Sequence, residues 1–157
     1  MKKTNNELLK ERIEQNYADF KTETLELDEE SIYDMAGRVA AVKDAYEQLA
    51  TYEYLDEDEA GYLLKFYNPL EMTADFLEAV RGGQLVEVDD ALFEVFEQED
   101  NEENYITIEF AEELRQEYGD DISIKNALLL ETVKASKEFL RLWKLMNEGV
   151  DFCHSEE

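Results

Sequence analysis

The sequence predicts a mainly α-helical protein, a single-domain helical bundle with a minor β-hairpin around residues 84–110. Three observations support this prediction. Helix-start patterns, in which Thr, Ser, Asp or Asn is followed three residues later by an acid, recur along the first half of the chain. Apolar residues follow them at steps of three and four, the period of one helix face. A single proline and six glycines leave few interruptions.

The first three helices are predicted from capping patterns at residues 4–7, 31–34 and 56–59. In such a pattern, each of the two side chains accepts a hydrogen bond from the other residue's free backbone N–H. The face that the first helix should bury holds Leu9, Ile13, Tyr17 and Phe20. The second, expected to be longer, has a stripe of Ile32, Met35, Val39, Val42, Tyr46 and Leu49.

A fourth helix is predicted to begin after Asn68, which can cap it, with Pro69 at the first helical position and Glu71 completing the pattern. Its buried face should hold Leu70, Ala74, Leu77 and Val80. Gly82 and Gly83 then provide a stop.

A last helix is predicted over residues 121–147. The residues expected to face inward are Leu129, Val133, Leu140 and Trp143. A basic stripe on its outer side holds Lys134, Lys137, Arg141 and Lys144. Two interpretations of the stripe stay open: a solvated face that complements the helix C-terminus, or a docking face for an acidic surface.

The segment between residues 84 and 118 gives mixed signals. LVEV and YITIEF alternate and carry β-branched and aromatic residues, which favours a short strand pair, whereas ALFEVFE and FAEELRQEY are typical of helices. The length and apolar content of the chain favour one domain. We therefore expect one acidic helical domain over residues 1–150 and a disordered tail over residues 151–157.

The charge of the chain is concentrated in its middle. The formal net charge is −26, whereas a few units suffice for the solubility of a small domain. Residues 22–121 hold five bases against 31 acids, and the two ends together are neutral. The densest part, residues 87–121, holds fifteen acids and one base. Because such self-repulsion destabilises a compact state, the excess indicates a use.

No catalytic residue, cofactor or metal site is predicted, and the protein is not expected to be an enzyme. The one histidine, His154, adjoins the one cysteine, Cys153, which provides neither a four-ligand zinc site nor a histidine-based triad in a pocket. Calcium loops that begin at Asp56 or Asn101 lack the closing acid or the central glycine. A magnesium-dependent enzyme that uses carboxylates alone stays open as a third hypothesis.

The expected location is cytoplasmic, without membrane association. No apolar run approaches the roughly 18 residues of a membrane span, and the first residues do not form a signal peptide. Direct binding of nucleic acid is not expected, because affinity for phosphates depends mainly on cations. The predicted partner is a basic nucleic-acid-binding protein, and the oligomeric state is left open.

The stretch EQEDNEENY, residues 97–105, places five carboxylates in nine positions. A folded acidic surface can occupy a basic groove in place of DNA, with carboxylates standing where phosphates would lie. The predicted partner-binding acids are Glu97, Glu99, Asp100, Glu102, Glu103, Glu109, Glu112 and Glu113. A secondary acidic cluster comprises Asp56, Glu57, Asp58 and Glu59. A solvated surface without a partner is the alternative interpretation.

The segment YEYLDEDEAGYLLKFYNPLEMTADFLE, residues 52–78, resembles a stretch of short acidic proteins from Gram-positive conjugative elements and prophages. In these proteins an acidic turn, a Leu-Leu helix and an N-P-L-E turn follow one another. The resemblance covers about a sixth of the chain and implies no catalytic residues. As a class, such proteins resemble antirestriction and anti-CRISPR proteins, several of which block the DNA-binding grooves of nucleases.

The resemblance and the charge together predict an acidic inhibitor, an anti-CRISPR that acts as a DNA mimic on a Cas9-type nuclease. Such a nuclease holds its nucleic acids in a positively charged channel. The alternative is an acidic protein-interaction module that regulates conjugation or transcription.

Overall fold

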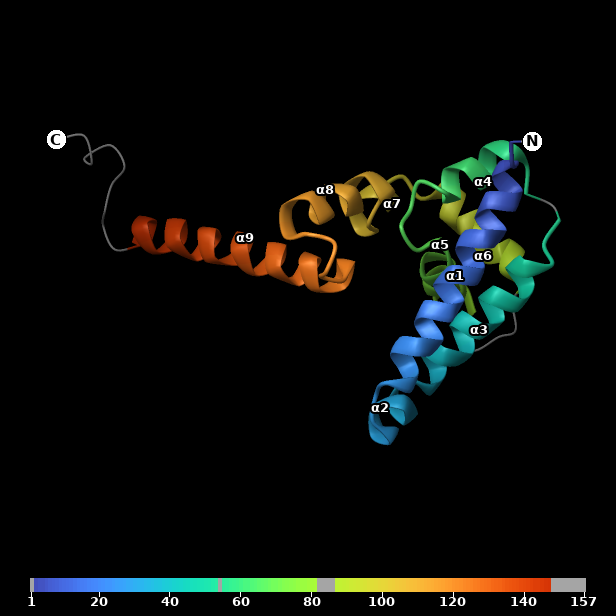
Figure 1. Ribbon diagram of the computed structural model, residues 1–157, viewed down its shortest axis with the longest axis horizontal. Helices are drawn as coiled ribbons and strands as arrows, with labels where there is room; N and C mark the ends of the chain where they lie inside the picture. Colours follow the sequence, from blue (N-terminus) through green and yellow to red (C-terminus); the bar gives the residue numbers. More distant parts are fainter. Residues whose placement is uncertain (1, 54, 82–86, 148–157) are drawn as a thin grey trace. The chain divides into compact units, whose positions relative to one another are not determined.

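The computed structural model describes residues 2–53, 55–81 and 87–147, and its elements there are all helices (Figure 1). They are α1 (Asn5–Leu25), α2 (Glu29–Asp34), α3 (Ala36–Ala50), α4 (Glu57–Leu63), α5 (Pro69–Arg81), α6 (Val88–Glu97), α7 (Asn101–Asn104), α8 (Ile108–Tyr118) and α9 (Ile124–Asn147). The prediction of a mainly α-helical bundle is confirmed. No helix among the described residues is long and apolar enough to cross a membrane.

The chain divides into two compact units, Met1–Glu109 and Phe110–Glu157. Whether both belong to one domain over residues 1–150 stays a prediction. The tail predicted over residues 151–157 and the stop at Gly82 and Gly83 lie outside the described residues.

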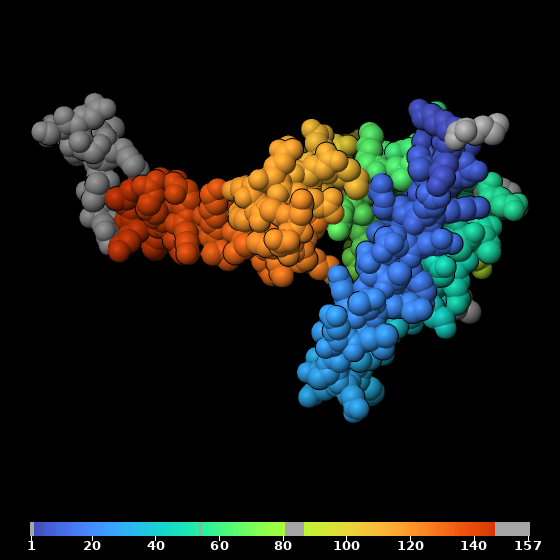
Figure 2. All heavy atoms as spheres, in the orientation of Figure 1, coloured from blue at the N-terminus to red at the C-terminus, as the bar shows by residue number. Residues whose placement is uncertain are grey.

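The first unit is built around α5, which packs against α1, α3 and α6. Three of the four residues predicted for the buried face of α5, Leu70, Ala74 and Leu77, are fully buried, and Val80 packs against the same core. Figures 1 and 2 show α1 and α3 side by side, and Leu9 of α1 lies in the same core cluster as the α5 residues. The apolar spacing thus identified the core-facing sides of these helices.

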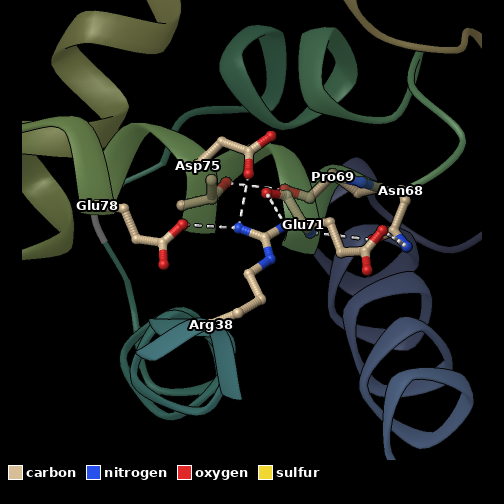
Figure 3. Close-up of polar contacts among 7 residues, drawn as sticks. Arg38, Asn68, Pro69, Glu71, Asp75 and Glu78 are labelled. Carbon is tan, nitrogen blue, oxygen red and sulfur yellow. Dashed lines mark hydrogen bonds and ion pairs between the residues drawn. The ribbon is translucent and has the colours of Figure 1, made fainter. Parts of the chain in front are cut away.

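Three predicted helix starts are confirmed. Thr4 and Glu7 form a complete capping box, with hydrogen bonds of 3.2 and 2.8 Å. Asp56 and Glu59 form another, with bonds of 2.8 and 3.1 Å. At α5, the side-chain oxygen of Asn68 accepts from the Glu71 N–H at 3.0 Å, while the Glu71 carboxylate accepts from the Asn68 amide (Figure 3).

The long second helix predicted from Ser31 is instead two helices. Asp28 caps α2, and its carboxylate accepts from the Ser31 N–H at 2.7 Å. The chain leaves helical geometry at Met35, with φ −93° and ψ 7°, and α3 begins at the next residue. The break puts Gly37 in a first turn rather than inside a long helix, where glycine costs about 1 kcal/mol.

Arg38 joins α3 to α5 through three contacts (Figure 3). Its guanidinium lies 2.6 Å from the Asp75 carboxylate and 3.1 Å from that of Glu78, and it donates to the Glu71 carbonyl at 3.4 Å. Only a quarter of the Arg38 side chain is exposed. The planar guanidinium of Arg38 can contact two carboxylates and a carbonyl at once. Arginine at this position therefore fixes the angle between α3 and α5 better than lysine would.

The minor β-hairpin predicted around residues 84–110 is absent from the part of that range that the structure describes. Val88 begins α6 rather than lying in a strand. YITIEF contributes one isolated antiparallel bridge, between Thr107 and Phe66, and then enters α8. Its backbone bonds go to residues 65–67 instead: Tyr67 N–H donates to the Ile106 carbonyl and Ile108 N–H to the Lys65 carbonyl, both at 2.8 Å.

The second unit contains most of α8 together with α9, and here the predicted inward face is wrong. Leu129, Val133, Leu140 and Trp143 are 63%, 49%, 59% and 55% exposed. Within this unit α9 instead buries Ile124 and Ala127, and Glu131 accepts a hydrogen bond from Tyr118 of α8, so another side of the helix meets α8. Length adds a second reason: at about 1.5 Å per residue, the 11 residues of α8 span about 16 Å and the 24 residues of α9 about 36 Å. Only the first turns of α9 can lie beside α8, and Figure 1 shows α9 extending beyond it.

Candidate functional site

The candidate site is the acidic segment, defined as the five carboxylates of Glu97, Glu99, Asp100, Glu102 and Glu103. The end of α6, the short α7 and the turn between them carry these residues in the first unit. Four of the five side chains are exposed, and Asp100 is half-buried. The structure therefore brings together five of the eight partner-binding acids that the sequence predicts.

A buried asparagine anchors the acidic segment. Asn101, in the middle of the acids, is 1% exposed. Its amide donates to the Val95 carbonyl at 2.7 Å and to the Tyr62 hydroxyl at 3.0 Å, which ties α7 to α6 and α4. These two hydrogen bonds fix the backbone around Asn101, because a displacement of the Asn101 side chain would leave the buried Val95 carbonyl without a donor.

A second anchor follows at Tyr105, whose ring lies against Phe76 of α5 with centroids 6.2 Å apart. Burial is the main reason why the pKa of Tyr105 rises to about 12, and a hydrogen bond to Asp75 adds to it. Asp75 is the carboxylate that Arg38 contacts in Figure 3. The acidic segment is thus held in its middle by Asn101 and just beyond its C-terminal end by Tyr105, and both side chains are uncharged.

Most carboxylates of the acidic segment are available to a partner. Within the described ranges, the carboxylates of Glu97, Glu99 and Glu103 make no hydrogen bond or ion pair. Glu102 lies 3.9 Å from Lys65, with both side chains more than half exposed, an arrangement that contributes little to stability. Gln98 donates to Asp100, which lowers the pKa of that carboxyl and keeps it ionised.

The three other predicted acids lie on α8. Glu109, Glu112 and Glu113 are exposed and stand at positions i, i+3 and i+4, so they share one face of the helix. Glu112 and Glu113 belong to the second unit, whereas Glu109 belongs to the first. We therefore treat this α8 face separately from the acidic segment.

The secondary acidic cluster at residues 56–59 has structural tasks. Asp56 and Glu59 form the capping box of α4. The Glu57 carboxylate accepts from the backbone N–H groups of Asn5 and Asn6 at 2.8 and 3.4 Å, so it holds the first turn of α1, and the Asn5 bond lowers its pKa. Three of these four acids are committed to helix ends, which makes the cluster a poor binding surface.

The contact between α1 and α4 also explains Gly61, which stands at the glycine position of the calcium loop that would begin at Asp56. Gly61 lies inside α4, and a Cβ there would meet the Asn5 side chain at 2.9 Å. The glycine permits close approach of α1 and α4, and the residues around it form a helix rather than a metal loop. Among the described residues, no group of three or more acidic, histidine or cysteine side chains is placed to hold a metal ion.

Sequence reasoning missed Asn101 and Tyr105 as the anchors of the site. The available signal was an uncharged amide flanked on both sides by acids, followed four residues later by an aromatic residue. No protein-family model, curated protein or solved structure matches the chain.

Proposed function

We propose that the protein is an acidic inhibitor of a nucleic-acid-binding protein, an anti-CRISPR that occupies the basic channel of a Cas9-type nuclease in place of DNA. The observation that carries the proposal is the acidic segment, in which exposed carboxylates stand on a support fixed by Asn101 and Tyr105. A fixed array of anions loses less conformational entropy on binding than a flexible acidic tail does.

The charge distribution supports an electrostatic mode of binding. The net charge of −26 speeds encounter with a positively charged channel, and this steering weakens as salt screens it. Within the complex, the carboxylates would pair with arginines and lysines that otherwise contact phosphates. The expected outcome is competition with DNA or guide RNA for the same basic surface.

The test compares two variants with equal charge. In the site variant, Glu97, Glu99, Glu102 and Glu103 become Gln and Asp100 becomes Asn. In the control variant, the same change is made at the exposed residues Glu14, Glu26, Glu29, Glu30 and Asp34. Both lose five negative charges, so any difference between them reports the location of the charge.

The assay measures cleavage of a labelled target duplex by a Cas9-type nuclease loaded with guide RNA. A desolvated charge pair in an interface is typically worth about 2 kcal/mol or more, so loss of several should weaken inhibition at least about 100-fold. The control variant should lose far less, and its loss should diminish at high salt. Equal inhibition by the parent and a folded site variant at every salt concentration would rule out this surface.

Capture from a host lysate separates the proposal from its alternative. We expect recovery of a CRISPR nuclease that the site variant fails to retain. Recovery of transcription or conjugation regulators would instead favour an interaction module encoded by a mobile element.

A further inference from the structure

Beyond α8, helix α9 carries an apolar face that the described residues of its own unit leave exposed. The face, hereafter the α9 apolar face, consists of Leu129, Val133, Phe139, Leu140, Trp143 and Met146. At about 100° per residue these side chains lie on one half of the helix, and the basic stripe lies on the other. Figure 2 shows the last turns of α9, in red, with no other described element of their own unit lying over them in this view.

The exposed area is large enough for a stable interface. Phe139 and Met146, the most exposed members of the face, are 65% and 70% exposed. Taking about 200 Å² for a fully exposed large side chain, the six residues present roughly 700 Å². The largest apolar patch of a typical monomer is about 300–600 Å², and a standard interface buries about 800 Å² from each partner.

The face also has the shape that a second helix requires. A surface hollow on α9 is lined by Thr132, Ala135, Ser136 and Phe139, together with Glu131 and Leu140. The first four stand at i, i+3, i+4 and i+7, the arrangement of the four residues that receive one side chain of a partner helix in a coiled coil. The small side chains at 135 and 136 leave room for that side chain.

The lysines along one edge of the face select the direction of the partner helix. Lys137 and Lys144, seven residues apart, lie along one edge of the face, and Ala135 and Leu142 lie along the other. Between two parallel copies, the basic edge of each helix lies along the uncharged edge of the other. Between antiparallel copies, like charges would meet.

We propose that the protein self-associates through the α9 apolar face, with the α9 helices of two copies parallel. The occupant of the face is therefore a second copy of this chain, and the pairing is isologous. The apolar side chains provide the affinity, and repulsion between the basic edges in an antiparallel pair provides the direction. The pairing would present two copies of the acidic segment in one assembly.

Sedimentation equilibrium of the full chain over about 1–100 μM tests the pairing. We expect a dimer that a variant with Phe139→Gln and Trp143→Gln converts to a monomer at the same concentration. The matched control is Leu130→Gln, which changes an exposed leucine of α9 outside the face and should leave the dimer unchanged. A parent that is monomeric at 100 μM, or a dimer that survives the double substitution, overturns the proposal.

Direction is tested by crosslinking in a Cys153→Ser background. Met146→Cys should form a disulfide between copies under mild oxidation, because identical positions adjoin in a parallel pair. In an antiparallel pair the two residues at 146 lie at opposite ends of the contact, so a dimer without this disulfide overturns the parallel arrangement. A circular dichroism spectrum equal to that of the parent checks that each variant stays helical.

Discussion

The two acidic clusters of the first unit have nearly the same composition and different tasks. At residues 56–59, carboxylates accept hydrogen bonds from the free N–H groups at the starts of α4 and α1. At residues 97–103, the carboxylates of Glu97, Glu99 and Glu103 have no partner among the described residues. The difference shows that an acidic run should be judged by what its carboxylates already contact, because a carboxylate committed to a helix start is not available to another protein.

The largest effect is expected when the buried anchor Asn101 is replaced by an acid. Asn101→Asp has almost the same shape, but its carboxylate cannot donate to the Val95 carbonyl, and two acceptors would face each other at about 2.7 Å. We expect a loss of about 3 kcal/mol in unfolding free energy, measured by urea denaturation, and weaker inhibition despite the extra charge.

The control for that substitution is Asn104→Asp, which adds the same charge at an exposed position of the same stretch. Its effect on stability should stay below about 1 kcal/mol. If Asn101→Asp were as mild as its control, Asn101 would not be an anchor.

A smaller effect is expected in the other cluster. Asp56→Ala removes the cap of α4, and a lost N-cap typically costs about 1 kcal/mol. Inhibition by the folded variant should equal that of the parent. Asp58→Ala, in the same cluster but without a capping bond, serves as the comparison. A loss of inhibition in either variant would assign a binding role to this cluster.

Acidification should destabilise the fold through the helix-start carboxylates. Hydrogen bonding by the Asn5 N–H lowers the pKa of Glu57 below its ordinary value of 4.5. Ionised Glu57 therefore stabilises the fold above about pH 4.5, and this contribution is lost as the pH falls through the folded-state pKa. The Glu57→Gln variant should show a smaller decrease of melting temperature between pH 7 and about pH 3 than the parent. Parallel pH profiles would contradict this role.

The smallest effect is expected for acids that contact nothing. Changing Glu97, Glu99 and Glu103 to Gln should alter the unfolding free energy by less than about 0.5 kcal/mol per site, with a slight gain at low salt because self-repulsion decreases. The gain should vanish at about 1 M salt, where charges are screened within roughly 3 Å. A marked loss of stability would mean that these acids have structural partners.

The sequence predicted local features well and long-range ones poorly. The caps at Thr4, Asp56 and Asn68 depend on neighbours within three residues, so their pattern can be read along the chain. The anchor at Asn101 depends on Tyr62, 39 residues away, and nothing local distinguishes it from an exposed amide.

The same limit explains the wrong prediction for α9. Its apolar spacing identified an amphipathic helix but carried no information on which element covers the face. An inward position is predicted on the assumption that a neighbouring element covers the apolar stripe. Within the second unit α9 instead buries Ile124 and Ala127, on another side of the helix.

In the acidic segment, the residues that fix the backbone differ from the residues that carry the charge, so mutation can change the charge alone. Asn101 and Tyr105 hold the backbone without using any of the surrounding carboxylates. Individual acids can then be gained, lost or shifted by single mutations without a penalty in folding, while the two anchors cannot. A lineage under pressure from changing targets could therefore explore new charge arrangements on an unchanged backbone, and descendants should differ most in their acids and least at positions 101 and 105.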